Sequence, residues 1–127
     1  MAELLEKELV YRIIGCALTV HKTLGPGLRE KTYENALCVE FRRERIAFNQ
    51  QARYPVLYRG EHVDEFVPDL VVEQRVIVDT KTVELITNDH RGVMINYLRI
   101  TRLKVGLIIN FKNRTMEWER IVLDEAR

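Results

Sequence analysis

The sequence has few cysteines, no long apolar run and no excess of either charge. Its only cysteines, Cys16 and Cys38, each stand singly within a helical pattern. This favours reduced, buried thiols over a disulfide framework or a zinc site. No run approaches the roughly 20 apolar residues that cross a bilayer, and no basic-then-apolar signal peptide opens the chain. We therefore expect a cytoplasmic protein with no membrane partner.

The near balance of charges excludes a protein that binds nucleic acid through a generally basic surface. The chain has 20 basic and 19 acidic residues, so any patch that attracts phosphates must be local. Hydrophobic residues make up 46% and charged residues 31%, which is typical of folded globular proteins. A chain of 127 residues most simply forms one domain, here residues 1–127.

Hydrophobic periodicity predicts an α/β (α+β) fold with a mixed sheet flanked by helices. Helices are expected over residues 3–23, 29–45 and about 88–102, the last capped by Asn88 or Asp89. Strands are expected over residues 52–59, 63–72, 76–83, 105–111 and 115–123. The run 105–111 is continuously apolar, which indicates a strand buried on both faces. The predicted order is therefore α-α-β-β-β-α-β-β.

Two short apolar strands, joined by a three-residue polar turn, carry an unusual set of charges. Side chains alternate between the faces of a strand, so Asp79 and Lys81 must share a face. A turn of this length pairs Val72 with Val76 and places Asp69 directly opposite Asp79. Facing carboxylates repel each other and destabilise a sheet. A chain that keeps them beside a lysine is therefore expected to use them.

The use that these residues suit best is metal-assisted hydrolysis of a phosphodiester. Carboxylate oxygens bind Mg²⁺, or Mn²⁺ in its place, and Mg²⁺ keeps several waters and needs one or two protein carboxylates. The ion polarises a phosphate and lowers the pKa of a bound water, and the lysine orients that water or offsets charge on phosphorus. The alternative is a surface strand with a solvated charged face, in which Lys81 is a simple counter-charge.

A second motif points to a known family. Residues Gly27-Leu28-Arg29-Glu30-Lys31-Thr32-Tyr33 spell G-x-x-E-x-x-Y. Together with Pro68-Asp69, Asp79-Thr80-Lys81 and the segments 96–99 and 103–111, this motif resembles the GxxExxY family, a branch of the PD-(D/E)XK nuclease superfamily. The resemblance implies a restriction-endonuclease-like fold and a nuclease that uses Mg²⁺ to cleave nucleic acid, with DNA the favoured partner.

The resemblance also assigns roles to residues. It implies that Glu30 joins Asp69 and Asp79 as a metal ligand and that these three carboxylates and Lys81 form the catalytic set. From the residues alone, the favoured interpretation of Glu30 is an ordinary acid in the first turn of a helix. Tyr33 faces the same way as Glu30 and is expected to pack, with its hydroxyl tethered.

Further residues are weaker candidates for substrate contact or for support of the site: His21, Glu84, His90 and Tyr97. His21 could instead satisfy carbonyl groups at the end of the first helix, and His90 could be an ordinary polar residue at a helix start. Cations that could meet phosphates lie late in the second helix and on or after the third: Arg42, Arg43, Arg45, Arg91, Arg99, Arg102 and Lys104.

Two departures from the family pattern support an alternative function. Val93 stands where relatives carry a glutamine, and position 79 is aspartate where glutamate is common. The loss of the glutamine removes a donor that would position substrate or water, yet it leaves the metal ligands unchanged. The alternative is an inactive nuclease-fold protein that binds nucleic acid or protein. A homodimer formed through an edge strand or helix face, or a targeting partner, would be compatible with either function.

Overall fold

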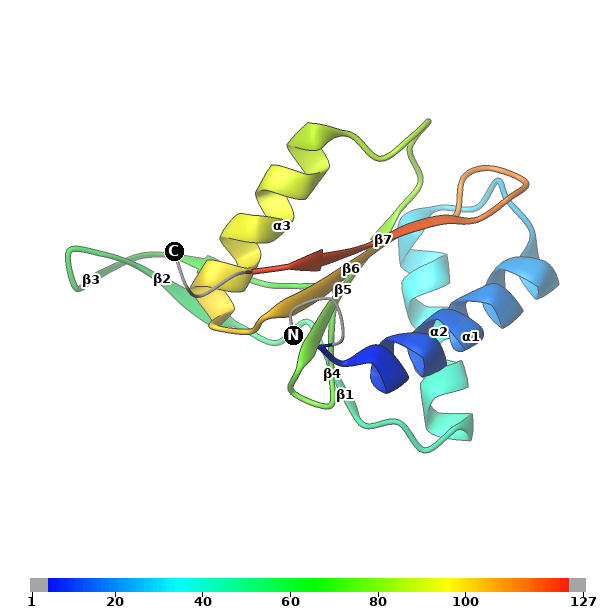
Figure 1. Cartoon of the computed structure of the whole chain (residues 1–127), viewed down its shortest axis with the longest axis horizontal. Helices are drawn as coiled ribbons and strands as arrows, with labels where there is room; N and C mark the ends of the chain where they lie inside the picture. The colour runs from blue at the N-terminus through cyan, green and yellow to red at the C-terminus, as the bar shows by residue number, and fades with distance from the viewer. Residues whose placement is uncertain (1–4, 124–127) are drawn as a thin grey trace.

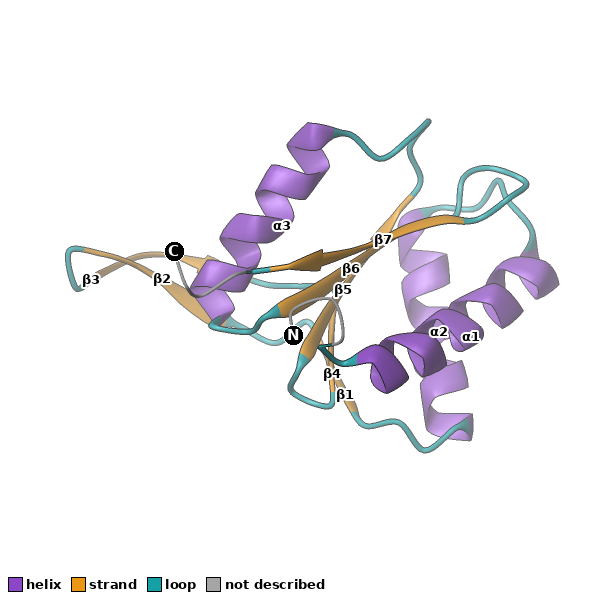
Figure 2. Cartoon of the chain, viewed as in Figure 1, coloured by secondary structure: helices purple, strands orange, loops and turns teal. Residues whose placement is uncertain are grey.

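The computed structural model of the chain describes residues 5–123, which form three helices and two sheets (Figures 1 and 2). The helices are α1 (Lys7–Leu24), α2 (Glu30–Arg43) and α3 (Asn88–Thr101). The strands are β1 (Phe48–Gln50), β2 (Tyr54–Tyr58), β3 (Glu61–Phe66), β4 (Leu70–Val72), β5 (Val76–Lys81), β6 (Val105–Asn110) and β7 (Glu117–Val122). The predicted mixed sheet with flanking helices is confirmed.

The main sheet has the strand order β1-β4-β5-β6-β7. Strands β5 and β6 are parallel, and the other neighbouring pairs are antiparallel. Every residue of β6 is buried, as the continuous apolar run predicts. The parallel pair requires a crossover, and α3 supplies it between β5 and β6. The carboxyl end of β5 therefore opens beside the loop that leads into α3.

The helices form two layers around this sheet. Helices α1 and α2 cover one face and α3 covers the other, as Figure 1 shows. Val76 and Val78 of β5 point into the core under α1 and α2, whereas Ile77 packs with α3. By the same alternation, Asp79 and Lys81 continue the face that α3 covers. The alternation of β5 thus turns both charged side chains toward α3.

Close contact between α3 and the sheet depends on a glycine in β6. Met94 of α3 is fully buried, and its side chain lies directly over Gly106. A Cβ atom at Gly106 would collide with the sulfur of Met94, so any larger residue would push the helix or this side chain outward. Gly106 thereby sets how close the α3 layer, and with it Tyr97, lies to β5.

The predicted strand 63–72 is wrong, because the chain breaks there into two strands. Val67, Pro68 and Asp69 separate β3 from β4, and Pro68 cannot donate to a strand ladder. Strand β3 pairs only with β2, forming a two-stranded arm that projects to the side of the main sheet (Figure 1). Strand β1 was missed because it is only three residues long. The observed order is therefore α-α-β-β-β-β-β-α-β-β.

The predicted helix boundaries need two corrections. The first helix was expected from residue 3, but it begins at Lys7, because Glu6 has a left-handed backbone with φ of 57°; residues 1–4 lie outside the described part. The cap of α3 is Thr87 and neither Asn88 nor Asp89. A Thr87 hydroxyl that accepts from the third residue of the helix outweighs the general preference for Asn and Asp.

Both cysteines are buried and unpaired, as expected. Burial raises the pKa of the Cys16 thiol to about 11, with help from Glu44, so this thiol stays protonated at neutral pH. Within residues 5–123, no helix has the length and apolar content that a bilayer crossing would need.

Candidate active site

The β4–β5 hairpin brings the predicted charges together. Val72 pairs with Val76, and Leu70 pairs with Val78, so the expected three-residue turn and register are confirmed. The register places Asp69 beside Asp79 just beyond the end of the ladder. Lys81 Nζ lies 3.2 Å from Asp79 Oδ2, which confirms that these two side chains share a face.

Asp69 is held by hydrogen bonds from two sides. Its Oδ2 accepts from the Thr80 backbone N–H at 2.9 Å and from the Thr80 hydroxyl at 3.0 Å. Its carbonyl oxygen accepts from the Gln51 N–H at 3.1 Å. The carboxylate of Asp69 is therefore fixed against β5 although the residue lies outside any strand.

The environment of Asp79 disfavours its ionised form. Burial raises the pKa of Asp79 from 3.8 to about 6, with a further increase from the Asp69 carboxylate and a partly opposing effect of Lys81. Burial lowers the pKa of Lys81. The charge of Asp79, its hydrogen bond to Lys81 and the charge of Glu30 together raise that pKa by more, so the net change is upward. At neutral pH the lysine is therefore an ammonium group.

A small cavity of about 60 Å³ opens at the two aspartates. It is lined by Asp69 and Asp79 together with Phe66, Val67, Pro68, Ile77 and Tyr97. The rings of Tyr97 and Phe66 stack with centroids 3.8 Å apart, which joins α3 to the end of β3. Burial raises the pKa of Tyr97, and the charge of Asp79 raises it further, so this wall of the cavity carries a neutral hydroxyl.

Glu30 enters the same region from α2. Its Oε2 accepts from the Thr82 N–H at 3.1 Å, immediately after β5, and its charge acts on Lys81. Glu30 therefore lies on the Lys81 side of the site, at the end of the strand. The structure brings Glu30, Asp69, Asp79 and Lys81 together at the carboxyl end of the central strand β5.

Tyr33 fixes the loop that delivers Glu30. Its hydroxyl donates to the Gly25 carbonyl at 2.6 Å and accepts from the Leu28 N–H at 3.1 Å. Its ring stacks on Phe111 with centroids 4.5 Å apart and is fully buried. Gly27 has φ of 105°, a conformation that a side chain would strain. The packing role predicted for Tyr33 is confirmed.

The donor set suits a divalent cation that keeps much of its water. Two carboxylates converge on one cavity, and burial, with a further contribution from Asp69, raises the pKa of Asp79. No group of three or more His, Cys, Asp or Glu side chains within residues 5–123 is arranged to hold a metal ion. Mg²⁺ needs only one or two protein carboxylates, so Asp69 and Asp79 fit it. The role of Glu30 as a third ligand stays a prediction.

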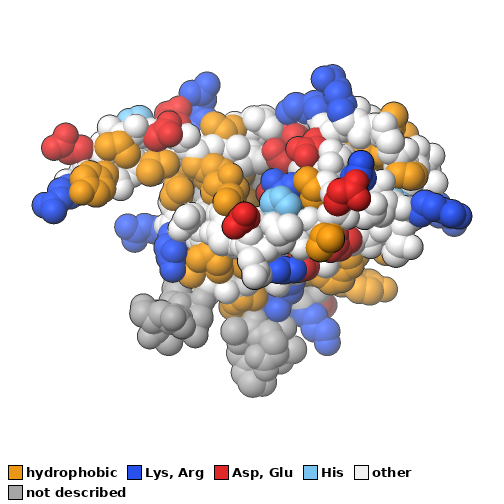
Figure 3. Space-filling model, turned by 90° about the horizontal axis from the view of Figure 1, so that it is seen from above, with side chains coloured by type: hydrophobic (Ala, Val, Ile, Leu, Met, Phe, Trp, Pro, Cys, Tyr) orange, Lys and Arg blue, Asp and Glu red, His pale blue; other side chains and the backbone are white. Residues whose placement is uncertain are grey.

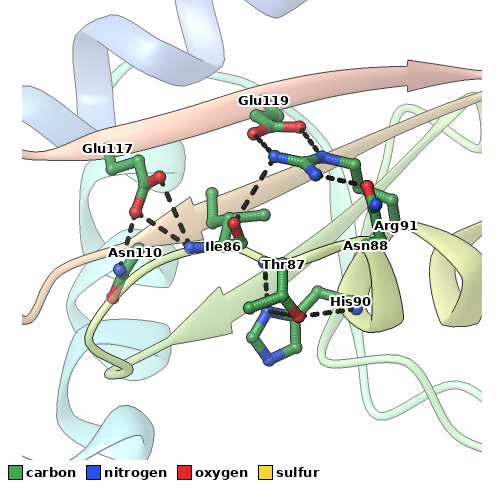
Figure 4. Close-up of polar contacts among 8 residues, drawn as sticks. All are labelled: Ile86, Thr87, Asn88, His90, Arg91, Asn110, Glu117 and Glu119. Carbon is green, nitrogen blue, oxygen red and sulfur yellow. Dashed lines mark hydrogen bonds and ion pairs between the residues drawn. The ribbon is translucent and has the colours of Figure 1, made fainter.

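Three weaker candidates have structural contacts instead. His21 Nε2 lies 2.8 Å from the Asn113 carbonyl oxygen, which ties α1 to the loop before β7. His90 Nδ1 accepts from the Thr87 N–H at 3.0 Å, completing the capping box of α3 that Figure 4 shows. The side chain of Glu84 is 86% exposed and lies 3.8 Å from Lys112. None of the three lines the cavity at the two aspartates.

Two of the cations named from the sequence already have partners within the protein. Arg91 donates to both carboxylate oxygens of Glu119 at 2.6 Å, which occupies its guanidinium (Figure 4). Arg42 lies over the Phe48 ring, 5.5 Å from its centroid. The face seen in Figure 3 intersperses hydrophobic, acidic and basic side chains. A phosphate backbone would therefore meet individual cations here.

Asn110 is a residue of the site region to which sequence reasoning gave no role. It pairs with Lys81 across β5 and β6, and its side chain is fully buried. Its Nδ2 donates to the Val83 carbonyl at 2.8 Å and to Glu117 at 3.0 Å, and its Oδ1 accepts from the Val83 N–H at 3.0 Å (Figure 4 shows the contact with Glu117). A lone asparagine that ends an apolar strand was the only available signal.

We expect Asn110→Ala to lower the free energy of unfolding by about 2–3 kcal/mol, because the buried groups of Val83 and Glu117 lose their partner. Urea denaturation measures this change, and faster amide exchange at Val83 locates it. Asn113→Ala is the matched control, since Asn113 is exposed and its side chain bonds only the Glu84 carbonyl. Equal destabilisation by both variants would contradict the assigned role.

Val93 lies on the exposed part of α3, one turn before Tyr97. It is 42% exposed, so the valine is not required by the core. The position expected to carry a glutamine is thus apolar, and it is not among the residues that line the cavity.

The chain is similar to known proteins in both sequence and fold. The family model described as the PD-(D/E)XK nuclease superfamily matches residues 7–121. A solved structure named SSO0001 superposes with a TM-score of 0.60 at 15% identity, and the match covers 95% of this chain and 61% of that one. The chain thus spans about three fifths of that protein, and the likeness concerns the fold alone. The comparison with curated protein sequences found no match.

Proposed function

Because the chain belongs to the PD-(D/E)XK nuclease superfamily, we propose that it is a metal-dependent nuclease that hydrolyses phosphodiester bonds, with DNA as its first substrate. The observation that carries the proposal is that Asp79 lies 3.2 Å from Lys81 and lines one cavity together with Asp69. The G-x-x-E-x-x-Y motif supports placement in the GxxExxY branch. A cytoplasmic location and pairing with a second copy stay predictions.

In this proposal Asp69 and Asp79 hold Mg²⁺, with Mn²⁺ able to replace it. The bound cation supplies Lewis acidity for a phosphate oxygen and lowers the pKa of a water. Thr80 keeps the Asp69 carboxylate in place through two hydrogen bonds, so the protein does not have to reorganise this group during the reaction. Burial of Asp79 strengthens its attraction for a cation, because less solvent screens the charge.

Lys81 acts as a charged donor rather than as a base. Its pKa is raised, so it keeps its proton at neutral pH and can face the negative charge that develops on the phosphoryl oxygens. Glu30 bonds the backbone after β5 and helps to hold Lys81 in its charged form. We propose that Glu30 supports the site in this way, whether or not it also contacts the cation.

The test is cleavage of supercoiled plasmid and of labelled single- and double-stranded DNA by the purified full chain. We expect cleavage with Mg²⁺ or Mn²⁺ and none after addition of EDTA. An Asp79→Asn preparation, purified in parallel, controls for contaminating nucleases. Equal cleavage by both preparations, or cleavage in EDTA, would overturn the proposal.

The apolar Val93 supports a second candidate, an inactive nuclease-fold protein that binds nucleic acid or protein. The glutamine expected at this position would donate to substrate or water, and valine cannot. Binding of DNA that is unaffected by EDTA, with no cleavage under any metal condition, would favour this function over the first.

A further inference from the structure

Beneath the site, α2 buries a carboxylate that the proposed chemistry does not use. Glu34 lies one turn after Glu30 and is only 3% exposed. Its Oε2 accepts from Gln50 Nε2 at 2.8 Å and from Gln51 Nε2 at 2.9 Å. Lys31 lies 3.2 Å from the same oxygen. Burying a carboxylate is costly unless donors surround it, and here three side chains do so.

The two glutamines connect this carboxylate to the backbone of Asp69. Gln50 is the last residue of β1 and pairs with Leu70. Gln51 follows it, and its N–H donates to the Asp69 carbonyl at 3.1 Å. Glu34 is thus joined to Asp69 by side-chain contacts and one backbone hydrogen bond.

The backbone conformation of Gln51 requires contacts from other residues to stabilise it. Its φ is 61°, in the left-handed region, which is unfavourable for a residue with a side chain. Such a conformation persists only where surrounding contacts impose it. The hydrogen bond from the Gln51 side chain to Glu34 is such a contact. Without it, the N–H of Gln51 would be free to turn away from Asp69.

Asp69 depends on this hold more than a strand residue would. It lies in the break between β3 and β4, outside the ladder that ends at Leu70 and Val78. Its position is determined by Thr80 at the carboxylate and by Gln51 at the carbonyl. Release of the carbonyl would let the carboxylate leave the Asp79 side of the cavity.

We propose that Glu34 is a positioning residue for Asp69 that acts through Gln51, and thereby determines how tightly the two aspartates bind a divalent cation. The effect on cation binding rests on the proposed function, whereas the positioning of Asp69 by Glu34 and Gln51 does not depend on catalysis. If Glu34 only joined α2 to β1, its removal would destabilise the fold without a specific effect on Asp69. The two roles can therefore be distinguished by measurement.

The experiment compares Glu34→Ala, Gln51→Ala and the double variant of the full chain. Gln51→Ala keeps the N–H that meets Asp69, so it removes the hold while leaving α2 and its core intact. Glu73→Ala is the control, because it removes a half-buried carboxylate that accepts from the Ala47 N–H at 3.0 Å, at the other end of β4 from Asp69. Mn²⁺ affinity is measured by calorimetry, and amide hydrogen exchange is measured at Thr80.

Thr80 is the reporter that needs neither metal nor activity. Its N–H donates to the Asp69 carboxylate and therefore exchanges faster when that carboxylate moves. Ile77, in the paired part of the same strand, provides the internal reference. A merely structural role of Glu34 would change exchange at both amides in parallel.

We expect each single variant to weaken Mn²⁺ binding about tenfold, as loss of groups that orient metal ligands generally does. Exchange at Thr80 should rise about tenfold relative to Ile77, and the double variant should be no worse than the singles. Unchanged Thr80 exchange in a folded Gln51→Ala protein overturns the proposal. If the wild type neither binds Mn²⁺ nor cleaves DNA but Thr80 responds, the hold on Asp69 stands and the proposed function fails.

Discussion

Asp79→Asn will abolish metal-dependent cleavage. In the absence of metal, it will also raise the stability of the protein relative to the wild type, and this gain will be larger at pH 7 than at pH 4. The first effect follows from loss of the charge that attracts the cation. A bound metal ion stabilises the charge of the transition state by several kcal/mol, and the loss of this stabilisation lowers the cleavage rate about 10³-fold or more. The second follows because Asp79 ionises with difficulty in the folded state, with a pKa of about 6.

The sign of the pH effect is determined by the direction of that shift. The pKa of Asp79 is higher in the folded state than its ordinary value of 3.8, first because of burial and then because of Asp69. Stability from the protonated form is therefore fully present below pH 3.8 and is lost as the pH rises through about 6. The full loss is on the order of 3 kcal/mol, since each pKa unit corresponds to about 1.4 kcal/mol, and most of it falls between pH 4 and pH 7. Asparagine has no charge to ionise.

Urea denaturation of both proteins at pH 4 and pH 7, without metal, measures this effect. The stability of the variant relative to the wild type should rise by on the order of 2 kcal/mol between the two pH values. Asp64→Asn is the control, because Asp64 is exposed on the β2–β3 arm. Added Mn²⁺ should stabilise the wild type and leave Asp79→Asn unaffected. A pH-independent difference would contradict the raised pKa, and retained cleavage would remove Asp79 from the site.

Lys81→Met will separate metal binding from catalysis. Methionine keeps most of the apolar stem but removes the ammonium group that faces Asp79 at 3.2 Å. We expect cleavage to fall about 10²–10³-fold, the loss typical when one donor to a developing oxyanion is removed. Mn²⁺ affinity should stay equal or increase, because a positive charge no longer competes for Asp79. Asp79→Asn should instead lose both properties.

Calorimetry and single-turnover cleavage at saturating Mn²⁺ together test this separation. Lys112→Met is the control, since Lys112 is exposed and its partner Glu84 lies outside the cavity. Lys81→Arg should recover little activity, because a planar guanidinium does not replace a compact ammonium group in a confined site. Weaker Mn²⁺ binding by Lys81→Met would show that the lysine acts on the metal site itself.

The β4–β5 hairpin was predictable because its determinants are local. A three-residue turn and strict alternation were enough to place Asp69 opposite Asp79 and Lys81 on the same face. The continuous apolar run of β6 likewise revealed a buried central strand. By contrast, the strand 63–72 was predicted as one element, because alternation alone cannot show that the chain leaves one sheet at Pro68 and enters another.

The contacts of the weaker candidates depended on partners distant in sequence. Nothing near His21 indicates that its ring meets the Asn113 carbonyl, 92 residues away. Arg91 was a plausible phosphate ligand until the packing of α3 against β7 paired it with Glu119. The polar partners of a side chain are selected by the packing of layers, and helical or strand periodicity carries no information about that choice.

The sequence by itself determined the nuclease superfamily, the hairpin and the acid–base composition of the predicted site, because motif spacing and strand alternation are properties of neighbouring residues. Only the tertiary structure decided which charges meet. It placed Glu30 beside Thr82 and Lys81, and it raised the pKa of Asp79 by burying it near Asp69. It also joined Glu34 to Asp69 through Gln51. Burial and long-range hydrogen bonds arise when separate elements pack, so these properties of the site exist only in the folded chain.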